Sequence, residues 1–101
     1  AYFGQAQYIM TNFPEIKDYA YYTIIRLYTS ACEKMCLNDY DAMYNREDVL
    51  AKYEIFKSAM QRIDRKILSE NLEPYRLLSA ITLDYDRTTF KKLLKEIHKV
   101  K

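Results

Sequence analysis

The clearest hydrophobic pattern in the chain runs through residues 45–69, where apolar side chains recur at alternating intervals of four and three residues. Its members are Val49, Tyr53, Phe56, Met60, Ile63 and Ile67. This spacing matches the turn of an α-helix and predicts one continuous apolar stripe on a helix of about six turns. Because a single stripe is buried only when another helix covers it, the pattern predicts a domain of packed helices.

Other segments are also predicted to be helical. The first spans residues 14–36, where Pro14 suits an opening turn and apolar residues again recur at helical spacing. This stripe comprises Ile16, Ala20, Ile24, Leu27, Ala31 and Met35. A short helix is expected at 74–81 and a C-terminal helix at 86–99, with turns at 37–44 and 82–85.

The predicted fold class is therefore all-α, a small single-domain helical bundle of four to five helices. Its long helices lie near 14–36 and 46–69, and a short helix over 2–10 would be the fifth. The length of 101 residues leaves room for one domain, which spans 1–101. One glycine and two prolines are too few for a sheet protein and exclude Gly-rich phosphate-binding loops. No apolar run reaches the roughly 18 residues of a membrane span, so no membrane contact is expected.

Few side chains suited to catalysis or metal binding are present. His98 is the single histidine, and its place in the last turn of a helix favours a structural role. Cys32 and Cys36 lie four residues apart on one helix face, too far apart for an unstrained disulfide, and are expected to be buried free thiols. We therefore expect no catalytic residue, no cofactor, no metal site and no small-molecule substrate. The free cysteines predict a cytoplasmic protein.

Basic residues are concentrated toward the C-terminus. Residues 1–60 carry six basic and eight acidic side chains, whereas residues 61–101 carry ten basic and six acidic ones. Arg87, Lys91, Lys95 and Lys99 recur every four residues on the predicted C-terminal helix and form a basic ridge, with Lys92 beside it. Such a ridge either neutralises phosphates or an acidic partner, or simply keeps the helix surface hydrated.

The order of the last two helices adds a resemblance. A short helix, a turn at 82–85 and a basic helix follow one another in the layout of a helix-turn-helix. The run DYDRTTFKKLL resembles the recognition helix of bacterial and phage helix-turn-helix regulators, with a polar cap at Asp86 and an inward residue at Phe90. The usual turn glycine of that family is replaced by Asp84.

This resemblance implies a set of nucleic-acid contacts on the C-terminal helix. Arg87, Thr88 and Lys91 would reach base edges in the major groove. Lys92 and Lys95 would hold phosphates. The implied partner is therefore DNA.

The tyrosines suggest a different partner. The chain has 11 of them, and Tyr21, Tyr22 and Tyr28 lie with Ile25 on the predicted helix 14–36. Helical geometry spreads these side chains around the helix, and Tyr21 and Ile25 are expected to point away from its apolar stripe. Exposed Tyr and Ile are typical of a protein contact, because Tyr offers area and a hydroxyl with few rotors to freeze. The alternative is a wide core that nearly surrounds this helix.

Two hypotheses of function follow. The first is a non-enzymatic interaction or regulatory module that binds a protein partner, or a second copy in a homo-oligomer, through Tyr21, Tyr22, Ile25 and Tyr28. The second is a DNA-binding regulator of the helix-turn-helix type, which uses the helix at 86–99. The two are compatible, since such regulators usually bind DNA as dimers.

Overall fold

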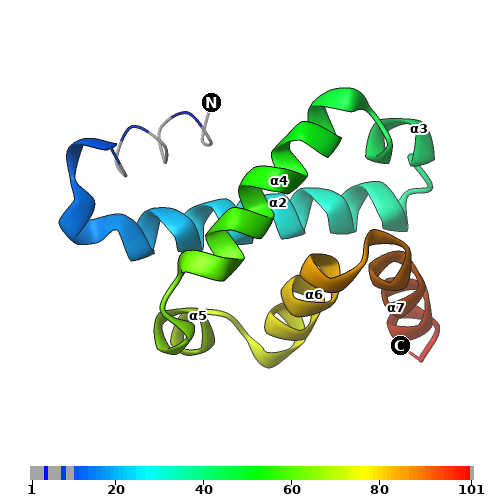
Figure 1. Cartoon of the computed structure of the whole chain (residues 1–101). Helices are drawn as coiled ribbons and strands as arrows, with labels where there is room; N and C mark the ends of the chain where they lie inside the picture. Colours follow the sequence, from blue (N-terminus) through cyan, green and yellow to red (C-terminus); the bar gives the residue numbers. More distant parts are fainter. Residues whose placement is uncertain (1–3, 5–7, 9–10, 101) are drawn as a thin grey trace.

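The computed structural model describes residue 4, residue 8 and residues 11–100, and it shows a bundle of helices (Figure 1). A 3-10 turn, η1 (Pro14–Ile16), leads into the long helix α2 (Lys17–Leu37), which the short α3 (Asp41–Tyr44) follows. Then come α4 (Glu47–Arg62), α5 (Arg65–Asn71), α6 (Pro74–Tyr85) and α7 (Arg87–Val100). The described residues contain no strand, so the all-α prediction is confirmed. The expected helix at 2–10 lies mostly outside the described residues.

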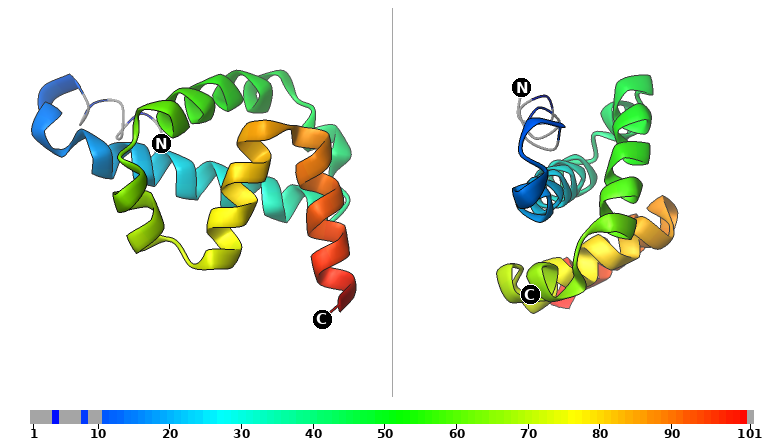
Figure 2. Two further views of the ribbon diagram at one scale, coloured as in Figure 1. Left: turned by 60° about the horizontal axis from the view of Figure 1, so that its bottom comes forward. Right: turned by 60° about the vertical axis from the view of Figure 1, so that its left-hand side comes forward.

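Helix α2 is the axis of the fold, and it contacts each of the helices α3 to α7. Figure 2 (right) looks almost along α2, with α4 on one side and α5 to α7 on another. Its buried side chains are therefore spread over more than half of its circumference. They are Ala20, Ile24, Ile25, Tyr28, Thr29, Cys32, Glu33, Met35 and Cys36.

The helix predicted at 46–69 is two helices in the structure, which corrects the sequence prediction. α4 ends before Ile63, and the backbone of Ile63 and Asp64 is extended. The Asp64 carboxylate caps α5 by accepting a 2.9 Å hydrogen bond from the amide of Lys66. The backbone amide of Asp64 donates to the Asp18 carboxylate on α2 at 3.2 Å. The break turns α5 so that Leu68 packs fully into the core.

The turn predicted at 82–85 is also wrong, because these residues are helical. The helix predicted at 74–81 therefore runs on to Tyr85. Asp86 alone separates α6 from α7, and its carboxylate caps α7 by accepting a 2.9 Å hydrogen bond from the Thr89 amide. The four-residue turn that the helix-turn-helix layout requires is thus absent from this part of the described chain.

The predicted loop at 37–44 contains the helical turn α3. Asp39 takes a left-handed backbone conformation, with φ of 56°, and this ends α2. The amide of Tyr40 then donates to the Met35 carbonyl at 2.8 Å and closes the end of the helix. The chain therefore reverses direction within a few residues, and α3 is placed against α2 and α4.

The apolar core is one cluster to which every helix from α2 to α7 contributes. Its largest fully buried apolar side chains outside α2 are Phe56, Met60, Leu68, Leu83, Phe90 and Leu94. None of the helices among the described residues is long and apolar enough to cross a membrane.

Candidate functional site

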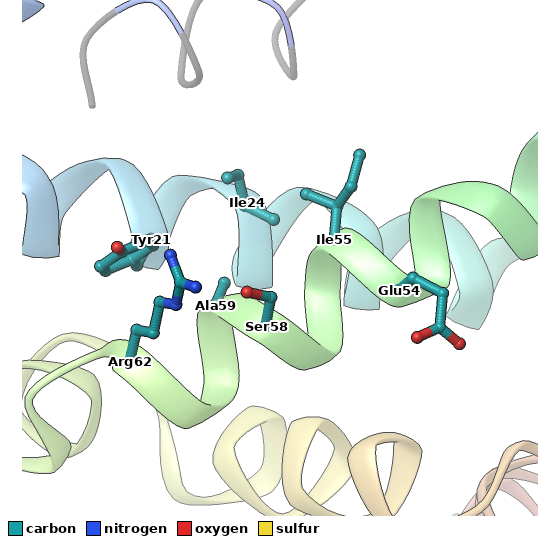
Figure 3. A pocket seen from close by; sticks show the side chains of 7 residues that line it. All are labelled: Tyr21, Ile24, Glu54, Ile55, Ser58, Ala59 and Arg62. Carbon is teal, nitrogen blue, oxygen red and sulfur yellow. The ribbon is translucent and has the colours of Figure 1, made fainter. Parts of the chain in front are cut away.

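A groove open to solvent lies between α2 and α4 (Figure 3). Its volume is about 310 Å³, at the lower end of the ~300–1,000 Å³ that is usual for binding pockets. The lining, which we call the α2–α4 groove, comprises Tyr21 and Ile24 from α2 and Glu54, Ile55, Ser58, Ala59 and Arg62 from α4. Its size suits a few side chains of a binding partner.

The floor of the groove is apolar. Ile24 and Ala59 are each only 1% exposed, whereas Tyr21 and Ile55 are half-buried and form the walls. Ser58 and Ala59 are short, so they leave open the space that longer side chains on α4 would fill. An apolar side chain that enters the groove would bury surface at a gain of about 25 cal/mol per Å².

Opposite charges stand at the two ends of the groove. Glu54 and Arg62 are exposed and lie eight residues apart on α4, which is about 12 Å along a helix axis. Figure 3 shows the Arg62 guanidinium reaching toward the Tyr21 end and Glu54 at the other end. The ion pairs found among the described residues involve neither side chain. Both charges are therefore available to orient a partner.

Of the four residues predicted to bind a partner, only Tyr21 lines this groove. Ile25 and Tyr28 are 0% and 3% exposed, so the prediction that Ile25 points into solvent is wrong, and Tyr28 is a core residue. The cause is the central position of α2, which other helices cover on several sides. Tyr22 is half-buried elsewhere, where its hydroxyl donates to the Asn71 carbonyl at 3.2 Å.

Tyrosines in and beside the core support the fold through their hydroxyl groups. Tyr28 donates to the Val49 carbonyl at 2.9 Å, and Tyr53 donates to the Leu83 carbonyl at 2.7 Å. The rings of Tyr28 and Phe56 stack with their centroids 5.2 Å apart. Burial raises the pKa of Tyr28 well above its usual value, so this hydroxyl remains a protonated donor. Packing and hydrogen bonding thus explain a part of the high tyrosine content.

Three residues of the basic ridge, Arg87, Lys91 and Lys95, contact the segment that joins α2 to α4. The Arg87 guanidinium lies 3.9 Å from the ring centroid of Tyr44 and donates to the Tyr44 carbonyl. The Tyr44 hydroxyl in turn donates to the Arg87 carbonyl at 3.1 Å. A second guanidinium nitrogen lies 3.4 Å from Oδ1 of Asn45. Arg87 therefore fastens α7 to the end of α3.

Two lysines of the ridge form ion pairs with the same segment. Lys91 pairs with Asp41, and Lys95 pairs with Asp39 at 3.2 Å. The hydrogen bond from Lys91 holds the pKa of the Asp41 carboxyl below its usual range. These charges on α7 thus offset the acidic charges of the 37–44 segment.

The predicted DNA contacts fall into two groups. Arg87, Lys91 and Lys95 have partners within the chain, as described above. Thr88 and Lys92 are exposed on α7. The structure therefore does not bring the five residues together on one unoccupied basic face.

The cysteines and the histidine are placed in different environments. Cys32 and Cys36 are buried free thiols, as predicted. Burial raises the pKa of Cys32 to about 12 and also raises that of Cys36, so the thiolate forms are disfavoured at neutral pH. His98 is exposed, and its Nε2 lies 3.5 Å from the Tyr75 hydroxyl oxygen. Within the described ranges, no group of three or more His, Cys, Asp or Glu side chains is placed to hold a metal ion.

One acidic side chain lies in the buried part of α2. Glu33 is 7% exposed, its Oε2 lies 4.0 Å from Nη1 of Arg76, and its Oε1 has no hydrogen-bond partner. Burial raises the pKa of Glu33, and the positive charges of Arg76 and His98 offset this only in part. Arg76 also donates to the Ser30 hydroxyl at 2.9 Å, and both residues line a second, more polar cavity.

An apolar stripe on α6 faces solvent. Its members, which we call the α6 ridge, are Leu78, Ile81 and Tyr85, with exposures of 49%, 44% and 81%. They follow the i, i+3, i+7 spacing of one helix face. That spacing is visible in the sequence, but α6 also carries inward apolar residues, so only the packing reveals which face is covered.

Comparison of the chain with protein-family models, with curated proteins and with solved structures finds no match.

Proposed function

We propose that this chain is a non-enzymatic helical interaction module, which binds an amphipathic helix of a protein partner in the α2–α4 groove. The observation that carries the proposal is the groove, with its apolar floor, its half-buried walls at Tyr21 and Ile55, and opposite charges at its ends. Helix-in-groove recognition uses this combination, because apolar side chains on one helix face enter the groove while flanking charges set the direction. The two buried reduced thiols are consistent with a cytoplasmic location.

Selection from a displayed library of helical peptides tests this proposal. The bait is the whole chain, and the counter-selection bait is the Ser58→Arg variant, whose long charged side chain fills the groove at a half-buried position. We expect enrichment of helices with apolar residues at i, i+3 or i+4, and i+7. Labelled protein titrated with an enriched peptide should show amide shifts centred on Tyr21, Ile24 and Ile55.

A matched control separates groove binding from general stickiness. Leu50→Lys introduces a charge at an exposed position of α4 outside the groove, and should leave peptide binding unchanged. Enriched peptides that bind the Ser58→Arg variant equally well would contradict the proposal. Shifts confined to α7 would contradict it as well.

The DNA-binding regulator remains a second hypothesis. What favours it is the exposure of Lys92 and Thr88 on a basic helix. It predicts that duplex DNA binds in a salt-dependent way and that the Lys92→Glu, Lys95→Glu double variant loses this binding while remaining helical. The interaction-module proposal instead predicts no salt-dependent complex with duplex DNA.

A further inference from the structure

The chain carries both an apolar groove and an exposed apolar ridge. The groove lies between α2 and α4, and the α6 ridge consists of Leu78, Ile81 and Tyr85. Apolar residues at i, i+3 and i+7 of a helix are the anchors that helix-binding grooves accept. The molecule thus presents a receptor surface and a ligand of the type that such a surface takes.

The two surfaces match in length. From Leu78 to Tyr85 the α6 ridge extends about 10 Å along its helix axis, and from Glu54 to Arg62 the groove extends about 12 Å. When the ridge is laid along the groove, Ile81 is its central side chain. It then lies over Ser58 and Ala59, whose short side chains line the groove.

The two surfaces also carry complementary charges at one end. Asp84 lies beside Tyr85 at the C-terminal end of α6. The groove carries Arg62 at one end and Glu54 at the other. In one direction of docking, Asp84 approaches Arg62, and this contact is favourable.

A single copy cannot make this contact with itself. α4 and α6 meet through their inward sides, since the Tyr53 hydroxyl of α4 donates to the Leu83 carbonyl of α6. Ala80 and Leu83 are buried on the inward side of α6, and the α6 ridge lies on the opposite side of that helix. The ridge therefore points away from the groove of its own chain.

We propose that the α6 ridge of one copy docks into the α2–α4 groove of a second copy, so that the chain assembles head to tail. This inference rests on the proposed function, for which it names a second copy as the partner. The contact is heterologous, because each copy uses its ridge on one neighbour and its groove on another. Such contacts produce rings when the rotation between copies closes, and open filaments when it does not.

Sedimentation velocity over a range of protein concentrations tests the proposal with three variants. Ile81→Lys removes the central anchor of the ridge, Ser58→Arg fills the groove, and Leu50→Lys is the matched control on an exposed aliphatic residue outside both surfaces. Circular dichroism checks that each variant is folded. We expect the wild-type chain and Leu50→Lys to grow beyond a dimer as concentration rises. Each of the other two variants should associate at least about tenfold more weakly.

The decisive sample is an equimolar mixture of the Ile81→Lys and Ser58→Arg variants. The first retains an intact groove and the second an intact ridge, so the mixture should form a one-to-one dimer that does not grow further. A wild-type chain that stays monomeric at all concentrations would overturn the inference. So would a mixture that forms no dimer, or a loss of assembly in Leu50→Lys.

The peptide selection distinguishes failure of this inference from failure of the proposed function. If library helices bind the groove while the wild-type chain remains monomeric, the groove is a receptor for a foreign helix and self-assembly is wrong. If the groove binds neither library helices nor a second copy, both proposals are wrong.

Discussion

Helix α2 is buried over more than half of its circumference, whereas α7 packs one side into the core and carries charged groups on the other. On α7, Phe90 and Leu94 are fully buried, while Lys91 and Lys95 reach acidic side chains of the 37–44 segment. On α2, even Glu33 is buried. The difference follows from position, because α2 contacts five other helices and α7 lies at the side of the bundle.

This comparison shows where side-chain type predicts exposure and where it does not. On a peripheral helix, the face away from the core carries polar side chains, because solvent and charged partners lie beside it. On a central helix, neighbours cover more than half of the circumference, and aromatic and polar side chains are then buried along with the apolar ones. The substitutions below test both halves of the comparison.

Ile25→Ala in α2 should have the largest effect. Ile25 is fully buried, and truncation of a buried Ile to Ala removes packing and leaves a cavity, at a cost of about 2–5 kcal/mol of unfolding free energy. Urea denaturation at neutral pH measures this cost. Ala31→Ser is the control on the same helix, since Ala31 is exposed and its substitution should change the free energy by at most about 0.5 kcal/mol. Unchanged stability in Ile25→Ala would place this side chain outside the core.

Arg87→Ala in α7 should come second. It removes the stacking on Tyr44 and the hydrogen bond to the Tyr44 carbonyl, which together predict a loss of about 1–3 kcal/mol. Arg87→Lys should recover only part of the loss, because a lysine retains the charge without the planar fork. Lys92→Ala, on the exposed side of α7, is the control and should be nearly neutral. If Arg87→Ala leaves the free energy of unfolding unchanged, Arg87 does not hold α7 to α3. Its guanidinium would then be available for the DNA contact of the second hypothesis.

The sequence predicts the helices of this fold better than their ends. Four of the helical segments were expected near their observed places, because their apolar residues repeat at the helical period. The break at Asp64 was not expected, since the same period continues through Ile63 and Ile67 on either side of it. The spacing of the apolar residues is the same whether Asp64 caps a new helix or lies on the surface of a continuous helix.

The candidate site was predictable only in part. Tyr21 was expected on a binding surface, and it lines the groove. Ile55, Ser58 and Ala59 were not singled out, because a groove depends on the packing of two helices against each other. Tyr28 and Arg87 are of residue types that are common at binding surfaces, yet each has its partner within the chain. A single sequence does not reveal that such contacts exist, because their partners are distant in the chain.

The buried charge of α2 provides a test based on pH. Burial raises the pKa of Glu33 in the folded state, so the folded chain holds this proton more tightly than the unfolded chain does. The contribution of Glu33 to stability is therefore greatest below its unfolded pKa of about 4.3, and it is lost as pH rises through the higher folded value. Glu33→Gln should flatten the stability profile in this window. At neutral pH it should be at least as stable as the wild-type chain.

The opposite result would show that the ion pair outweighs burial. If Glu33→Gln is clearly less stable at neutral pH, the attraction between Glu33 and Arg76 exceeds the cost of desolvation. Arg76→Gln provides the complementary measurement, because it leaves Glu33 buried without a cation and should raise the pKa of Glu33 further.

The smallest effect is expected for the surface ion pairs of α7. Lys91→Gln breaks the pair with Asp41 and should lower the melting temperature slightly at low ionic strength. The loss should shrink at high salt, where exposed charges are screened. In the wild-type chain the lowered pKa of Asp41 implies a contribution to stability that is present above about pH 3.9 and is lost as pH falls through the folded value.

The control is Lys92→Gln, which removes the same charge from α7 without breaking this pair and should show neither dependence. Equal salt and pH profiles in the two variants would mean that the charges of α7 act only through the net charge of the helix. The side of α7 that faces α3 would then be as available to a nucleic acid as the side that carries Lys92.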